Sequence, residues 1–441
     1  MTRPIKNKER EAIIQSLRSG VVPKIGLQHI QVGRSEEIKS FVRDIQNVSE
    51  GGSSFRFVIG EYGSGKTFFL SLVRSIALEK GLVTMHADLS PSKRLHGSQG
   101  QARSLLSELI SSLSTRTRQD GNALENILDR FISVVKEEAS LNKKNIGQVL
   151  SSILKDMVDI PGGSDFVQVI GKYCESYEND DEILRSKALK WLRAEYTTKK
   201  DSFVDLGVRE FINDKSLLNT IKLYCLLVRK SGYNGLMVCL DELVNLYKIT
   251  NTVSRNANYE EILRMLNDTL QGSFSSLGFI MGGTPEFLTD SRRGLYSYEA
   301  LRSRLAENSF ASQLGLIDYN STVLRLASLT KEELYVLLQN LRHVFACGTP
   351  NDYIVPDPAL NAFLIHCSRK IGDSYFRTPR TTIKTFLDLL SMLEQYPTLK
   401  WTDIINNIEI VQDRELSGFG KSNASSDVGE YSDDEFASFR L

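Results

Sequence analysis

The residues of this chain that most clearly specify chemistry form a glycine-rich octapeptide at 60–67, Gly-Glu-Tyr-Gly-Ser-Gly-Lys-Thr. Its Gly-x-x-x-x-Gly-Lys-Thr spacing is typical of a phosphate-binding P-loop. The glycines let consecutive backbone N–H groups turn toward a phosphate. We expect Lys66 to reach the β- and γ-phosphates and the Thr67 hydroxyl to bind Mg²⁺. The nucleotide-binding residues predicted from this motif are Gly60, Glu61, Tyr62, Gly63, Ser64, Gly65, Lys66 and Thr67.

Two acidic residues far downstream supply groups that nucleotide hydrolysis also requires. Asp241 and Glu242 follow the apolar run Gly-Leu-Met-Val-Cys-Leu at 235–240. We expect Asp241 to join Thr67 around the metal and Glu242 to polarise the attacking water. The alternative is an acidic helix cap that follows a core strand. Together with the octapeptide, the pair favours hydrolysis.

Two further polar residues are candidates for contact with the γ-phosphate. Thr284 ends the apolar segment 276–283, and ligands gather at the carboxyl ends of parallel strands. A turn that only caps this strand is an equally good interpretation. Arg380 follows Pro379, a residue suited to the first position of a helix, which would direct the arginine toward the sheet. A solvated arginine remains the alternative.

An arginine cluster follows the Thr284 segment. Arg302 and Arg304 are the catalytic candidates, because they are placed to act as arginine fingers toward a neighbouring subunit. Arg292 and Arg293 belong to the same cluster, and at least two of the four are expected to be ordinary surface arginines. This interpretation predicts a homo-oligomer whose activity depends on association.

The elements that must position these residues are strands that alternate with helices. Apolar strand segments lie within 54–59, 81–88, 235–242, 276–287 and 321–327, and a helical pattern over 68–78 directly follows the octapeptide. Alternation of this kind predicts a parallel sheet between helical layers. The predicted fold class is therefore α/β, a three-layer P-loop NTPase.

The spacing of the motifs predicts how the chain is divided. The interval from Lys66 to Asp241 is far longer than one strand and two helices require. We therefore assign 1–96 and 211–328 to the ATPase core and 97–210 to a mainly helical insertion, which contacts partners or substrate or is purely structural. The pattern is all-helical over 329–412, which we assign to a helical lid. The Ser-, Asp- and Glu-rich stretch 413–441 is expected to be a disordered acidic tail.

Composition sets broad limits on the class of protein. A chain of 441 residues with 41% hydrophobic residues can bury one large core and a smaller one, and its length suggests about two or three domains. It contains no apolar run long enough to span a membrane, and its first residues lack the apolar segment of a signal peptide, so we expect a soluble, cytoplasmic protein without membrane association. Its five cysteines form no C-x-x-C pair, which favours free thiols over disulfides or zinc. The 54 basic and 54 acidic residues cancel, which leaves only a local basic surface for DNA.

The motifs together resemble those of AAA+-like P-loop ATPases. The resemblance is carried by Gly60–Thr67, Asp241-Glu242, Gly283-Thr284 and Thr378-Pro379-Arg380. More narrowly, the chain resembles the BrxC/BrxD ATPases of BREX (bacteriophage exclusion) defence over most of its length, and is most similar to the short member, BrxD. The phrases that carry this narrower resemblance are 235–243, 282–287, 298–305 and Val32-Gly33-Arg34.

The resemblance implies more than the residues alone establish. It implies ATP and Mg²⁺ as cofactors, an anti-phage role, and partners that include a helicase, a methyltransferase or a Lon-like protease, with DNA bound nonspecifically. It also implies that Gly33 and Arg34 lie near the adenine, where backbone recognition is favoured over a side-chain contact to the base.

The class of output remains open at this point. An ATP-driven motor or switch that acts on DNA or a protein–DNA assembly is the first hypothesis. The second is a signalling or scaffold ATPase that uses ATP as a conformational latch for protein partners. An origin-recognition-like loader would need a winged helix, and residues 396–412 are too few to form one.

Overall fold

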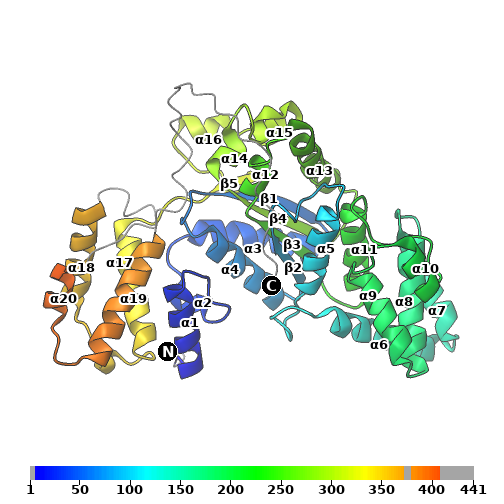
Figure 1. Ribbon diagram of the computed structural model, residues 1–441, viewed down its shortest axis with the longest axis horizontal. Coiled ribbons are helices and arrows are strands. Elements are labelled where there is room, and N and C mark those ends of the chain that lie inside the picture. Colours follow the sequence, from blue (N-terminus) through cyan, green and yellow to red (C-terminus); the bar gives the residue numbers. More distant parts are fainter. Residues whose placement is uncertain (1–4, 372–378, 408–441) are drawn as a thin grey trace, which may run out of the picture.

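A five-stranded parallel sheet forms the centre of the protein (Figure 1). The computed structural model describes residues 5–371 and 379–407, and the acidic tail 413–441 and Thr378 lie outside these ranges. The strand order is β2-β3-β4-β1-β5. The strand bounds are β1 Ser53–Ile59, β2 Val83–Asp88, β3 Leu236–Asp241, β4 Leu277–Gly283 and β5 Val323–Arg325. The predicted α/β class with a parallel sheet is confirmed.

Helices cover both faces of this sheet, which explains its continuous apolar strands. All residues of β3 and β4 are buried, as expected for parallel strands enclosed on two sides. Helices α3 (Ser35–Ser49) and α4 (Lys66–Glu79) pack on one face through side chains such as Phe41 and Phe69. Helices α5 (Gln101–Ser111), α11 (Leu217–Lys230) and α13 (Thr252–Leu270) pack on the other. The arrangement has three layers.

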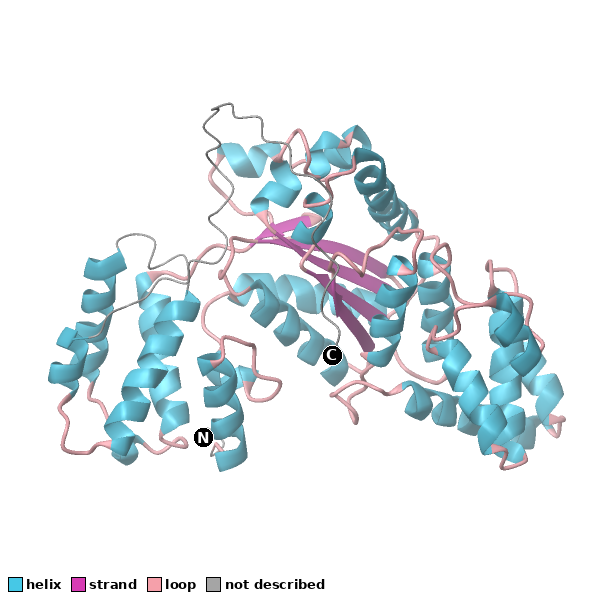
Figure 2. Cartoon of the chain, in the orientation of Figure 1, coloured by secondary structure: helices cyan, strands magenta, loops and turns pink. Residues whose placement is uncertain are grey.

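The long interval between β2 and β3 is helical and forms one side of the molecule (Figure 2). Its elements after α5 are α6 Leu124–Asn142, α7 Ile146–Ile153, η1 Lys155–Met157, α8 Gly163–Glu178, α9 Glu182–Leu192 and α10 Lys199–Leu206. Phe166 of α8 packs edge-on against Trp191 of α9 and Tyr224 of α11. These aromatic contacts make the helices continuous with the core of the sheet.

A second hydrophobic core lies on the opposite side and combines the two ends of the described chain. Its helices are α1 Asn7–Arg18, α17 Lys331–Phe345, α18 Asp357–Ile371, α19 Pro379–Gln395 and α20 Trp401–Asn407. We call α17 to α20 the C-terminal helical group. Ile13 of α1 is fully buried in this core. Arg18 on α1 also pairs with Asp388 on α19 at 2.9 Å. The first helix, which the sequence analysis groups with the ATPase core, thus packs with the last ones.

Short helices complete the chain near the carboxyl edge of the sheet. They are α2 Leu27–Ile30, α12 Val244–Tyr247, α14 Pro285–Thr289, η2 Leu295–Ser297, α15 Glu299–Arg304 and α16 Ser309–Gln313, with η3 Pro350–Asp352 in the C-terminal helical group. Within the described ranges, no helix combines the length and apolar character that a membrane crossing demands. All five cysteines are free thiols, as predicted, and four of them are buried.

Candidate functional site

The glycine-rich loop, residues 60–67, connects β1 to α4. Gly63 and Gly65 have φ angles of 78° and 87°, in the left-handed region that favours glycine. Gly65 is the N-cap of α4, and Lys66 is the first helical residue. The unpaired N–H groups of the first turn of α4 therefore face the loop, an arrangement that suits a phosphate.

The Lys66 ammonium lies over this loop. Its Nζ donates hydrogen bonds to the carbonyl oxygens of Gly60 at 2.7 Å and Glu61 at 2.9 Å. Burial lowers the pKa of Lys66, while the carboxylates of Asp241 and Glu242 oppose that shift. A cation held here by carbonyl oxygens is placed to exchange them for the oxygens of a phosphate group.

Thr67 and Asp241 form a hydrogen-bonded pair of oxygen groups beside the loop. The Thr67 hydroxyl donates to Asp241 Oδ2 at 2.8 Å, and Asp241 Oδ1 accepts from the Glu242 N–H at 2.8 Å. Gly282 on the neighbouring strand provides room, because a Cβ atom there would lie 2.3 Å from Asp241 Oδ1. A hydroxyl and a carboxylate, completed by water and phosphate oxygens, are what Mg²⁺ prefers.

Glu242 lines the same pocket from the end of β3. Its φ of 58° is unusual for a residue with a side chain, and such conformations cluster at functional sites. Partial burial and then the neighbouring Asp241 raise the pKa of Glu242, against the effect of Lys66 and Lys248. A carboxylate with a raised pKa is a better acceptor for the proton of water.

Thr284 follows β4, the strand that lies between β1 and β3. Its Oγ1 is buried and has no hydrogen-bond partner, and it makes no capping bond to α14. The Ser64 hydroxyl in the glycine-rich loop is likewise buried without a partner. Buried hydroxyls without partners cost free energy, so both are suited to accept or donate to a bound group.

Arg380 reaches the glycine-rich loop from α19. Its Nη1 donates to the Tyr62 hydroxyl at 3.1 Å, and both residues line the pocket. Its guanidinium passes close over Gly20, where a Cβ atom would lie 2.4 Å from Nε. Pro379 is the first residue of α19, as the sequence predicted.

Arg34 contacts the glycine-rich loop through its side chain. Its Nη2 donates to the carbonyl oxygen of Ser64 at 2.7 Å and to that of Ala327 at 3.1 Å. Gly33 lies beside α17, where a Cβ atom would be 2.0 Å from Glu333 Oε1. The side chain of Arg34 donates to protein carbonyl oxygens. The contact that we expect Gly33 and Arg34 to make with adenine would therefore come from their backbone.

Sequence reasoning missed the apolar half of the pocket. Beyond the loop, apolar side chains from the segment after α1, from α2 and the residues that follow it, and from α17 and α19 line the pocket. They include Val21, Val22, Ile30, Val32, Leu337 and Ile383. An apolar wall with a few polar groups suits a planar base. Val32, at the start of the Val-Gly-Arg phrase, was the only sequence signal for this wall.

A comparison with protein families decides the identity. The model of the BREX system ATP-binding proteins BrxC/D matches residues 5–409, nearly the whole chain. The chain belongs to the BrxC/BrxD family. A search of curated proteins finds no match. The family description implies nucleotide binding and a role in phage defence, and the resemblance to this family predicted from the sequence is confirmed.

In this BrxC/BrxD-family protein, the arginine cluster does not line the pocket of its own chain. Arg302 is exposed and lies 3.9 Å from Glu299, while Arg304 donates to Asn267 at 2.8 Å. Arg293 donates to the carbonyl oxygens of Tyr247 and Ile249, which gives it a structural role.

A further carboxylate of this BrxC/BrxD-family protein lies beside the site. Asp88 ends β2 and is paired in register with Asp241 of β3. Burial and then the charges of Asp241 and Glu242 raise the pKa of Asp88 to about 6. The sequence could have indicated Asp88, because it ends the predicted strand 81–88, and other predicted strands also end in polar residues such as Asp241.

Proposed function

We propose that this BrxC/BrxD-family protein binds and hydrolyses ATP with Mg²⁺, as an AAA+-like P-loop ATPase of BREX defence. The observation that carries the proposal is the 2.8 Å hydrogen bond between Thr67 Oγ1 and Asp241 Oδ2 in a pocket that Glu242 also lines. Thr67 and Glu242 both line the pocket, and the bond from Thr67 holds the Asp241 carboxylate beside them, so the candidate metal ligands and the candidate base lie together.

The polar groups around the glycine-rich loop each have a role in this proposal. The backbone N–H groups at the start of α4 and the Lys66 ammonium bind the phosphates. Thr67 and Asp241 hold Mg²⁺, which neutralises charge on the phosphate oxygens. Glu242 orients the attacking water and accepts its proton.

We assign two further residues to the γ-phosphate: Arg380 lines the pocket, and Thr284 follows Gly283, whose carbonyl oxygen accepts from the Gly60 N–H of the loop. Thr284 offers its unpartnered hydroxyl to the attacking water or the γ-phosphate. Arg380 reaches the loop from the C-terminal helical group, so it is the residue through which that group senses the phosphate. The closeness of Arg380 to Tyr62 supports this role.

We propose that Arg302 and Arg304 act in trans, in a homo-oligomer. Arg302 is exposed and loosely paired, and Arg304 is exposed at the end of α15, so both can reach another copy. Arginine fingers contribute about 10³–10⁵ in rate, so a single copy would hydrolyse ATP slowly.

We also keep the proposed division of the chain. The core comprises 1–96 and 211–328, the insertion 97–210 and the lid 329–412, although α1 within the first range packs against the lid helices. The apolar wall of the pocket supports a lid that contacts the base. We also propose that, within the family, the chain is most similar to BrxD.

The output we propose is a motor or switch that acts on DNA or on a protein–DNA assembly, with a helicase, a methyltransferase or a Lon-like protease as partner. Family membership supports this output. The second candidate is an ATP latch for protein partners. The extensive helical insertion, which carries no recognised catalytic motif, favours that reading.

ATP turnover by the purified protein, with and without duplex DNA at low and high salt, tests the function. Mg²⁺-dependent turnover that DNA stimulates supports the motor, whereas tight ATP binding with negligible turnover supports the latch. Removal of residues 414–441 is expected to tighten DNA binding at low salt, because an acidic segment competes with phosphates. Absence of ATP binding would overturn the proposal.

A further inference from the structure

Arg34 joins two segments that are far apart in the sequence. The same nitrogen, Nη2, donates to the carbonyl oxygen of Ser64 in the glycine-rich loop and to that of Ala327, between β5 and α17. The connection at Ala327 leads directly into the C-terminal helical group. A displacement of either carbonyl therefore changes the hydrogen bonds of one guanidinium.

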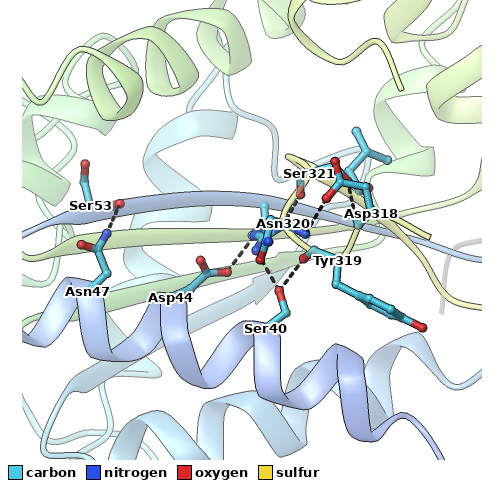
Figure 3. A network of polar contacts seen from close by, with 10 residues as sticks. Ser40, Asp44, Asn47, Ser53, Asp318, Tyr319, Asn320 and Ser321 are labelled. Atoms are coloured by element: carbon cyan, nitrogen blue, oxygen red, sulfur yellow. Dashed lines mark hydrogen bonds and ion pairs between the residues drawn. The ribbon is translucent and has the colours of Figure 1, made fainter. Parts of the chain in front are cut away.

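The backbone of Arg34 is anchored to the sheet through helix α3. Arg34 precedes α3, and the middle of α3 is tied to β1 by the buried Arg56, whose Nε donates to Asp44 at 2.7 Å and whose Nη2 donates to Ser40 at 2.8 Å. Ser40 in turn donates to the carbonyl oxygen of Tyr319, ahead of β5 (Figure 3). Helix α3 is thus fixed to β1 and to the segment that enters β5.

Gly33, the residue before Arg34, packs closely against the first turn of α17. A Cβ atom at Gly33 would lie 2.0 Å from Glu333 Oε1. Glu333 closes the capping box of α17, since its other carboxyl oxygen accepts from the Thr330 N–H at 2.9 Å and its own N–H donates to the Thr330 hydroxyl at 3.1 Å. Gly33 and Arg34 therefore contact both the connection to α17 and its N-terminal cap.

The guanidinium of Arg34 has little freedom to find other acceptors. Its Nη1 is buried and has no hydrogen-bond partner, so Nη2 carries the contacts to the two carbonyls. Burial lowers the pKa of Arg34, against the opposing charges of Glu37 and Glu333. If the Ser64 carbonyl turns away, an enclosed charged group loses one of its two acceptors, which is unfavourable.

We propose that Arg34 is a positioning residue that couples nucleotide occupancy of the glycine-rich loop to the order of α17 and the C-terminal helical group. This coupling rests on the proposed ATP binding. Phosphates bound to the loop fix the Ser64 carbonyl, Arg34 then holds the Ala327 carbonyl, and the first turn of α17 is restrained. Both hydrogen bonds come from one nitrogen, Nη2, so the coupling depends on the reach of this side chain and on the two N–H groups of that nitrogen.

Amide hydrogen exchange of the full chain, with and without a non-hydrolysable ATP analogue and Mg²⁺, tests the coupling. In the wild type, the analogue is expected to slow exchange in the glycine-rich loop and α4, and also in α17 by about fivefold or more. In Arg34→Ala, the slowing in the loop and α4 should persist while that in α17 is lost. Arg34→Met, which keeps much of the length of the side chain and removes its N–H donors, should also lose the slowing in α17.

The control is Arg43→Ala, which removes an exposed arginine from the same helix, α3, and should leave both responses intact. If Arg34→Ala does not fold, Arg34→Met decides alone. Full slowing in α17 of either folded Arg34 variant overturns the proposal. So does a wild type that responds in the loop but not in α17. A wild type without any response to the analogue overturns ATP binding, and the coupling with it.

Discussion

The Thr67 hydroxyl donates a 2.8 Å hydrogen bond to the carboxylate of Asp241, which lies 174 positions later in the chain. Thr67 lies in the first turn of α4, which the glycine-rich loop joins to β1, and Asp241 ends β3; β1 and β3 are the two strands that flank β4. Gly282 of β4 leaves the space that the carboxylate occupies. The oxygen pair therefore depends on three adjacent strands.

Gly282→Ala is expected to displace the Asp241 carboxylate and to lower ATP turnover on the order of 10²-fold, because small misplacements of catalytic groups cost that much. The structural reason is the 2.3 Å approach of a Cβ atom at Gly282 to Asp241 Oδ1. Steady-state ATPase rates measure the effect. Gly171→Ala is the matched control, since its Cβ meets no atom within 4 Å. Equal rates in both variants would contradict the assignment of Asp241.

Lys66→Ala is expected to abolish ATP binding or turnover. No other cation among the described residues donates to the carbonyl oxygens of Gly60 and Glu61, where the phosphates are expected. Calorimetric titration with ATP and an ATPase assay check this. Lys80→Ala, at the exposed C-cap of the same helix, should behave as the wild type. Unchanged affinity and turnover in Lys66→Ala would refute the site.

Glu242→Gln is expected to keep ATP binding and to lose about 10²–10⁴ in turnover, because it preserves shape and removes the base. The pH dependence follows from the raised pKa of Glu242. The base acts only when ionised, so turnover should fall as the pH drops through a value above the usual 4.5 of glutamic acid. A pH series of kcat measures this. Wild-type turnover in Glu242→Gln would reduce Glu242 to a helix cap.

Arg302→Ala or Arg304→Ala is expected to depress turnover without loss of ATP binding, by up to about 10³–10⁵ if the residue is a finger in trans. Specific activity of the wild type should then rise with protein concentration or with an added partner. A dilution series measures it. Constant specific activity, together with full activity of both variants, would count decisively against hydrolysis that depends on association.

Arg56→Ala is expected to lower the free energy of unfolding by about 3–5 kcal/mol, because it leaves a largely enclosed Asp44 without its partner. Arg56 itself is only 5% exposed and also donates to Ser40. Denaturant titration measures the change. Lys39→Ala, which breaks the exposed pair with Glu36, should cost less than about 1 kcal/mol. Similar losses in the two variants would show that the buried network adds no particular stability.

The sequence by itself determined the local features of this protein. The glycine-rich loop, its strand and its helix are contiguous, so Gly63, Gly65 and Lys66 could be assigned from spacing alone. Because parallel strands end at one edge of a sheet, Asp241 and Thr284 could also be placed near the loop. The resemblance to BrxC/BrxD proteins, which the family match confirms, could also be read from short sequence segments such as Val32-Gly33-Arg34.

Tertiary structure alone decided which distant surfaces meet. An amphipathic pattern states that a helix has a buried face and leaves the partner of that face unspecified, so the packing of α1 on α19 was not foreseen. The apolar wall at Val22 and Leu337 and the hydrogen bonds of Arg34 to Ser64 and Ala327 likewise join separate segments. These contacts depend on how the packed layers are oriented, a property that no local spacing encodes.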